Sequence, residues 1–322
     1  MPRPLLILAL FAMLGAVSLC WGLVSGSVPL SSADVLRAFA GDAPGAVGDI
    51  VFKIRLPRVF AGFACGGLLA LAGALLQVLL RNPLADPYVL GISGGAGLGI
   101  LGATSLGVGY AGAQLAGLGG ALSAVLVVFG LSFRAGDWNL YRLLLTGVVF
   151  SAGCSALISL ILLLAPQAAV KGMLFWMLGD LSEATSAWWP WLALATCGTA
   201  SVVGSGALNV MMLGRSKAIS LGVPVAAAEV AIYLLASAAT VTSVSLAGTV
   251  GFVGLIVPHL VRLLGVTDYR WLIPSAILGG GALLSLADTA ARSLWAPLQI
   301  PVGALTALMG VPLVLVLLAR RR

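Results

Sequence analysis

In the sequence GALLQVLLRNPLADPYVLGISGGAG (residues 73–97), a short polar turn separates two apolar runs. Asn82 precedes Pro83 within this turn, and Asp86 precedes Pro87. Proline fixes its own φ and keeps the residue before it out of the helical region, so two such pairs predict a tight, rigid connection. The runs on either side lack the alternation of barrel strands, which favours two helices that cross a membrane.

The composition of the whole chain agrees with a membrane protein. Hydrophobic residues make up 61% and charged residues 8% of the 322 residues, whereas a soluble domain is about half apolar and about a quarter charged. So few charges could not cover a water-soluble fold of this size. The net charge of +7 is distributed between the apolar runs, so membrane topology explains it and nucleic-acid binding is not expected.

Long apolar segments recur along the chain and predict an all-α, polytopic membrane protein with about ten transmembrane helices. We treat residues 1–322 as a single transmembrane domain, because no soluble domain stands out. The first run could be a signal peptide, but its length and the lack of a clear cleavage site favour a retained helix. The predicted spans are 4–24, 57–80, 88–106, 112–133, 142–165, 188–207, 227–249, 251–267, 272–294 and 302–319.

Lys and Arg residues predict the orientation of the spans. With the N-terminus inside, the inner side carries Arg3, Arg81, Arg134, Arg142, Arg215, Lys217, Arg262, Arg270, Arg320, Arg321 and Arg322. The outer side then carries only Arg37, Lys53, Arg55, Arg58, Lys171 and Arg292. Because positive charge concentrates on cytoplasmic loops, both termini are expected in the cytoplasm.

Motifs of catalysis are missing from the sequence. It contains no GxxxxGK[ST] phosphate loop, no HExxH and no GxSxG, so we expect no ATP hydrolysis by this chain and no cofactor or metal site. The cysteines stand within or at the ends of apolar segments without a CxxC pair, which favours a packing role for Cys20, Cys65, Cys154 and Cys197.

Acidic residues are scarce within the predicted spans. Only Asp288 falls well inside one, and Glu229 lies near the start of another. Carriers driven by an ion gradient usually keep acidic groups at mid-membrane, so this scarcity argues weakly against them. A secondary transporter nevertheless remains the alternative function, and a membrane-embedded enzyme is a third.

Two basic segments are candidates for partner contacts. The sequence IRLPR (residues 54–58) places Arg55 and Arg58 at the predicted outer end of the second span, as interfacial anchors or as a docking patch for an acidic protein. The segment GRSKAISLGVP (residues 214–224) is polar and too short to span. It is either a connecting loop or a small cytoplasmic helix that fits a motor protein. The turn at 81–87 is likewise either a plain turn or an inner constriction of a pathway.

These segments, in this order, resemble the FecCD-type permease subunits of importers for cobalamin, haem and ferric siderophores. The similarity extends over nearly the whole chain. It is strongest at IRLPR (54–58), at residues 73–97, and at RLLLTG (142–147), SLGVP (220–224), SLAGTVGFVGLIVPHLVRLLG (245–265) and PVGALTALMGVP (301–312).

The resemblance implies a type II ABC importer permease fold in the bacterial inner membrane. It further implies a homodimer that binds two copies of a cytoplasmic ATPase and a periplasmic substrate-binding protein, with membrane lipid around it. The fifth and tenth spans would line the pathway at the dimer axis. The transported substrate would be a metal chelate.

The resemblance also assigns roles to particular residues. Arginines at the outer face would meet acidic residues of the binding protein: Arg55, Arg58 and Arg292. Two cytoplasmic gates would consist of Asn82, Pro83 and Leu84, and of Asn139, Leu140 and Tyr141. The helix that couples to the ATPase would comprise Gly214, Arg215, Ser216, Lys217, Ala218, Ile219, Ser220, Leu221 and Gly222. Leu140 and Tyr141 are bulky where some relatives carry Thr and Ser, so the second gate is expected to close differently.

Overall fold

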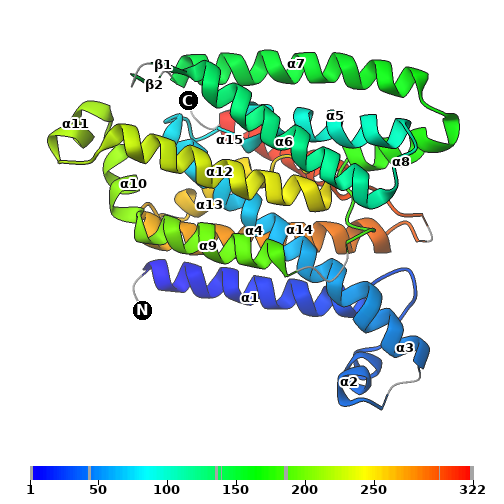
Figure 1. Cartoon of the computed structure of the whole chain (residues 1–322). Helices are drawn as coiled ribbons and strands as arrows, with labels where there is room; N and C mark the ends of the chain where they lie inside the picture. Colours follow the sequence, from blue (N-terminus) through cyan, green and yellow to red (C-terminus); the bar gives the residue numbers. More distant parts are fainter. Residues whose placement is uncertain are drawn as a thin grey trace.

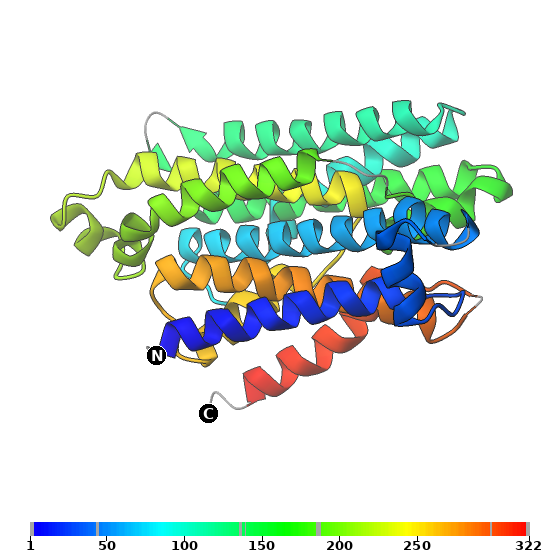
Figure 2. The ribbon, with the colours of Figure 1, turned by 90° about the horizontal axis from the view of Figure 1, so that it is seen from below.

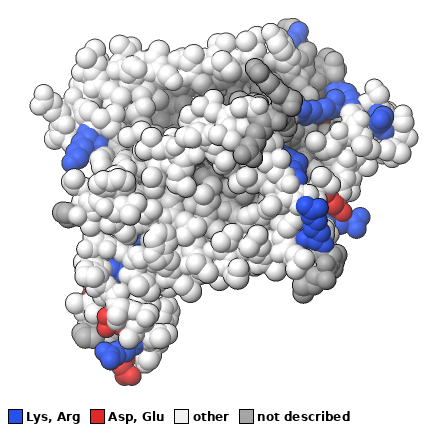
Figure 3. Space-filling model, turned by 180° about the vertical axis from the view of Figure 1, so that it is seen from behind, with Lys and Arg blue, Asp and Glu red and all other residues white. Residues whose placement is uncertain are grey.

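The computed structural model describes residues 3–42, 45–134, 137–138, 140–184, 188–296 and 298–319. Long helices lie side by side in a bundle (Figures 1 and 2). On the face seen in Figure 3, charged side chains gather toward the two ends of this bundle and a broad uncharged band lies between them. This distribution suits a protein that spans a bilayer.

Six helical segments of the described chain are long and apolar enough to cross a membrane. They are α1 (Arg3–Val24), the segment Gly45–Leu79 that contains α4 (Leu56–Leu79), α6 (Tyr110–Ser132), α7 (Leu140–Leu164), α12 (Val225–Ala247) and α14 (Tyr269–Ser293). A seventh candidate is the pair α9 (Trp189–Val203) and α10 (Ser205–Met211), which is bent by 62°. The predicted span 188–207 is therefore broken at Gly204.

Three further predicted spans correspond to shorter helices: α5 (Ile92–Ser105), α13 (Val253–Leu263) and α15 (Val302–Ala319). The 11 residues of α13 would rise only about 16 Å at 1.5 Å per residue. That is about half of a hydrocarbon core of about 30 Å. Each predicted span thus contains helix, but not every helix can cross the membrane by itself.

The shortness of α13 follows from an irregular segment between α12 and α13. Gly248 and Phe252 both have positive φ, at 66° and 71°, so the helix cannot continue through them. The Val250 amide donates to the Tyr88 hydroxyl at 2.9 Å, and the Thr249 hydroxyl donates to the Met177 carbonyl. Such partners are required wherever non-helical backbone lies inside a membrane protein.

Helix α4 forms the centre of the bundle, and 94% of its apolar window is buried. Glycines allow its neighbours to approach. A Cβ at Gly73 would lie 1.8 Å from the Gly254 carbonyl oxygen of α13, and a Cβ at Gly66 would lie 2.1 Å from the Gly280 oxygen of α14. Small residues promote such close backbone packing in lipid.

Helices α5 and α6 pack in the same way. A Cβ at Gly95 would lie 2.3 Å from the Gly120 oxygen, and one at Gly99 would lie 2.1 Å from the Ala116 oxygen. Gly95 and Gly99 are four residues apart and share one face of α5, so this face is the one that meets α6.

Short elements occupy the two ends of the bundle. At one end, α2 (Ser32–Ala40), α3 (Gly45–Asp49) and η1 (Ile50–Arg55) stand off the end of α1 (Figure 1). A capping box begins α2: the Ser31 side chain accepts from the Asp34 amide, and Asp34 accepts from the Ser31 amide. Hydrogen bonds from Ser31 also hold the pKa of Asp34 below its usual value.

Helix α11 (Arg215–Ser220) lies at the opposite end, where α1 begins and α15 ends (Figure 2). We call the two ends the α2 end and the α11 end. Between α6 and α7 the structure has a two-stranded antiparallel ladder, β1 (Phe133–Arg134) with β2 (Asp137–Trp138). The chain also contains η2 (Pro87–Leu90) and α8 (Gln167–Met177).

Candidate functional site

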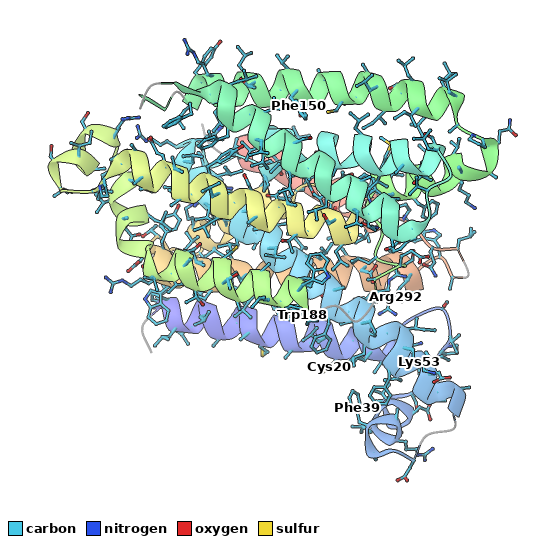
Figure 4. The ribbon with its side chains drawn as sticks, in the orientation of Figure 1. Cys20, Phe39, Lys53, Phe150, Trp188 and Arg292 are labelled. Carbon is cyan, nitrogen blue, oxygen red and sulfur yellow. The ribbon has the colours of Figure 1, made fainter. Side chains whose placement is uncertain are left out.

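Three arginines of the α2 end come together around one carboxylate. Arg58, near the start of α4, donates from Nε and Nη2 to Asp288 of α14, with Nη2 2.8 Å from Oδ1. Arg292, one turn after Asp288, places Nε 3.6 Å from Oδ2. Figure 4 shows Arg292 at this end of α14, beside the start of α4. Arg58 Nη1 also donates to Gln299 Oε1 at 3.2 Å.

Arg55 completes the arginine cluster, which we define as Arg55, Arg58, Arg292 and Asp288. Its Nη1 donates to the carbonyls of Leu23 and Val24, at 2.8 and 2.5 Å. These are the last carbonyls of α1, which have no partner within the helix. A cation there also suits the negative end of the helix dipole. Arg55 thus caps α1 and fixes it to α4.

The cluster is buried, unlike an ordinary docking patch. The exposed fractions of Arg55, Arg58 and Arg292 are 2%, 7% and 6%. Within the described parts of the chain, Asp288 is the carboxylate that pairs with Arg58 and Arg292, so three arginines share one directly bound acid and the cluster keeps an excess of positive charge. Burial of a charge is unfavourable unless it is paired. The sequence predicted that the three arginines lie on one side of the membrane, but it did not indicate that Arg58 and Arg292 pair with Asp288.

Helix α11 is fixed to the bundle by a second ion pair. Arg215 Nη1 lies 3.3 Å from Oε2 of Glu229, a residue of α12 that is 0% exposed. Ala218 of α11 is also buried. Arg215 therefore positions α11 against α12. The sequence noted Glu229 but gave no sign of this partner.

The other face of α11 is open. Ile219 and Leu221 are exposed apolar residues, as are Met212 and Leu213 just before the helix. Lys217 is also exposed. Gly222 has a φ of 81°, and its amide donates to the Ile219 carbonyl, which ends the helix. The segment is a helix with an unpartnered apolar face and is not a simple loop.

The predicted gate residues lie at the α11 end. The Asn82 side chain accepts from the Leu84 amide at 3.0 Å, so the turn is rigid as expected. Leu140 packs against the core, whereas Tyr141 is exposed to 74%. Asn139 lies outside the described residues.

A cavity of about 770 Å³ lies between α5, α6, α8 and the loop after α8. Its wall is mainly apolar and includes Met173 and Trp176, and its polar lining includes Lys171, Asp180 and Glu183. Among the described residues, no group of three His, Cys, Asp or Glu side chains could hold a metal ion.

Comparison with known proteins identifies the family of this chain. The model of the FecCD transport family matches residues 13–320. The chain belongs to the FecCD transport family. The hemin transport system permease protein HmuU of Yersinia pestis is 37% identical, and the alignment covers 99% of this chain and 95% of that protein. The vitamin B12 import system permease protein BtuC of Citrobacter koseri is 36% identical over 93% of this chain and 94% of its own length.

A solved structure agrees with the FecCD assignment. A metal-chelate type ABC transporter in an inward-facing conformation has a TM-score of 0.84 and 29% identity, over 98% of this chain and 99% of that chain. The chain is therefore a transport permease, a family that is not itself catalytic. This membership decides against the secondary transporter and the membrane-embedded enzyme that the sequence left open.

Proposed function

We propose that this FecCD-family chain is the permease subunit of a bacterial ABC importer for a metal chelate, such as haem, cobalamin or a ferric siderophore. The observation that carries this proposal is full-length similarity to permeases of hemin and vitamin B12 import. A separate ATPase supplies the energy, and a soluble binding protein delivers the chelate. The permease provides the pathway.

Helix α11 is the part that we assign to ATPase coupling. Its apolar residues Ile219 and Leu221 are exposed at one end of the bundle, and a cytoplasmic partner would remove them from water. The Arg215–Glu229 pair links α11 to α12. A displacement of α11 would therefore be transmitted directly to α12, a long helix of the bundle.

The arginine cluster is the part that we assign to the binding protein. Its excess positive charge lies at the end opposite α11, and an acidic residue of a partner would balance it. Because the arginines are buried in this conformation, that contact requires a side chain that reaches inward, or an outward turn of an arginine. Charged contacts of this kind set encounter rate and register.

We assign the cytoplasmic gates to Asn82–Leu84 and to Asn139–Tyr141. Two features support this assignment: the rigid turn at Asn82 and the exposed ring of Tyr141, both at the α11 end. This end would face the cytoplasm of the cell, with both termini on that side of the inner membrane. Figure 2 shows the start of α1 and the end of α15 there.

A second copy of the chain would complete the pathway. Helix α7 is the least buried of the long helices, with 17% of its apolar window buried, and α15 exposes Leu308 and Leu315. In the proposed homodimer these two helices line the pathway at the symmetry axis. Native mass spectrometry of the purified importer should give two permeases and two ATPases, and a single permease per complex would contradict the dimer.

Copurification tests the proposed function as a whole. The permease alone should not hydrolyse ATP, whereas its complex with the ATPase should do so, and faster when the loaded binding protein is added. Binding-protein affinity should also fall as salt rises, since salt screens charges over about 8 Å at physiological strength. ATP hydrolysis by the permease alone would overturn the proposal.

A further inference from the structure

A small unit projects sideways from the α2 end. It consists of α2, α3 and η1, and we call residues 32–42 and 45–55 the α2 foot. Figure 1 shows it beyond α1, on the outer side of the bundle. The foot therefore overhangs the space beside α1 and does not cover the middle of the bundle.

The foot has a small core of its own. Val35, Ala38 and Val51 are buried together, and Leu23 and Val24 of α1 pack against them. Val35 and Ala38 are three residues apart and so share a face of α2. This core, together with the Arg55 hydrogen bonds to α1, holds the foot in a fixed position.

A second apolar face of the foot has no partner. Leu36 and Phe39 lie next to the buried face of α2 and are exposed to 70% and 54%. Phe52 and Ile54 of η1 are exposed as well. The rings of Phe39 and Phe52 meet edge to face with their centres 5.1 Å apart, so the two helices form one continuous surface.

Charged residues of the foot form ion pairs within its helices. Arg37 pairs with Asp34 at 4.0 Å, and Lys53 pairs with Asp49 at 2.8 Å. In Figure 3 the charges of the foot gather toward its tip. Figure 4 shows Phe39 on the side of the foot nearer the middle of the bundle, below α1. The foot is thus amphipathic.

We propose that the α2 foot binds the membrane surface, with Leu36, Phe39, Phe52 and Ile54 inserted among the lipids beside α1. Continuity with α1 supports this occupant. Leu10, Val17 and Trp21 expose an apolar face of α1 that leads toward the foot. The lipid in contact with α1 would extend under the foot without a gap.

The chemistry of the foot fits this position. Amphipathic helices lie in the interface with aromatic and aliphatic side chains in the acyl region and charged ones at the headgroups. Arg37 and Lys53 have long side chains that can reach headgroups while their stems stay near the apolar layer. The foot would thereby fix the depth of α1 in the membrane. Because Arg55 links α1 to α4, it would fix the depth of α4 as well.

Spin labels can locate the foot relative to lipid and water. Cys20 is the only exposed cysteine among the four free ones, so Cys20→Ala removes the readily labelled thiol. In this background, Leu36→Cys, Phe39→Cys and the control Arg37→Cys are labelled one at a time. The complete importer is then placed in phospholipid nanodiscs, and collisions with oxygen and with a water-soluble nickel chelate are measured by EPR.

The proposal predicts that the labels at 36 and 39 collide often with oxygen and rarely with nickel, and that the label at 37 does the reverse. The ratio of the two collision rates should differ several-fold between positions 39 and 37. High nickel collision at 36 and 39 would place the foot in water and overturn the proposal. Low collision with both reagents would indicate a protein contact, with a second copy or with the binding protein, and would also overturn it.

Discussion

The Nη2 atom of Arg58 lies 2.8 Å from Oδ1 of Asp288, and both side chains are buried at the α2 end of the bundle. Asp288 also lies against Arg292. It is therefore the one carboxylate of the arginine cluster, which joins α4, α14 and the end of α1. The cluster connects the proposed docking surface to three long helices of the bundle.

Asp288→Asn should destabilise the protein because it leaves buried arginines without a counter-charge. Removal of one partner from a buried ion pair raises the free energy of the folded state by about 3–5 kcal/mol. The matched control is Asp49→Asn, which breaks the exposed pair with Lys53 and should change stability by less than about 1 kcal/mol. Thermal unfolding in detergent measures both, and equal melting temperatures would show that Asp288 has no structural role.

Charge reversal at Arg215 and at Lys217 should have different effects on the melting temperature, although the two residues are only two positions apart in α11. Arg215→Glu places a second negative charge beside buried Glu229 and should lower the melting temperature. Lys217→Glu changes an exposed side chain and should leave it nearly unchanged. The reversed pair Arg215→Glu with Glu229→Arg should recover part of the loss, and no recovery would mean that the pair does not fix α11.

Ile219→Asp should uncouple transport from ATP hydrolysis. The side chain is exposed in the isolated chain, so the variant should fold and insert normally while its contact with the ATPase weakens. Ile219→Leu keeps an apolar side chain at the same position and serves as the control. The informative quantity is substrate transported per ATP hydrolysed, and an unchanged value for Ile219→Asp would remove α11 from the coupling path.

Gly73→Ala should disrupt the contact between α4 and α13. A Cβ there would lie 1.8 Å from the Gly254 oxygen, so the two backbones must separate. Such overpacking raises the free energy of the folded state by about 1–3 kcal/mol or more. Gly119→Ala in α6 meets no atom within 4 Å and is the control. The yield of folded monodisperse protein and its melting temperature should fall only for Gly73→Ala, and equal values for both variants would refute the close approach.

Local signals allowed much of the fold to be predicted. Ser31 and Asp34 are three residues apart, so the cap of α2 could be read directly from the sequence. Likewise, the polar stretch around Arg215 indicated either a loop or a small helix, and the structure contains the helix, α11. The pairing of Arg58 with Asp288 could not be read in this way, because the two residues are separated by 230 positions.

Some features depend on tertiary context that a single sequence does not display. Phe252 has a positive φ that its residue type does not favour, and this shortened the predicted eighth span. One available signal was missed. Asp288 is the acidic residue well inside a predicted span, and Arg292 follows it by one helical turn, which is the spacing of a helical ion pair.

Transport in proteoliposomes tests the central claim most directly. The permease is reconstituted with its ATPase and the external binding protein. Uptake of haem, cobalamin and a ferric siderophore is then measured with and without ATP, and with and without ionophores that collapse all ion gradients. The account predicts that one of these chelates accumulates only when both ATP and the binding protein are present. Uptake that proceeds without ATP and stops when the ion gradients are removed would contradict it.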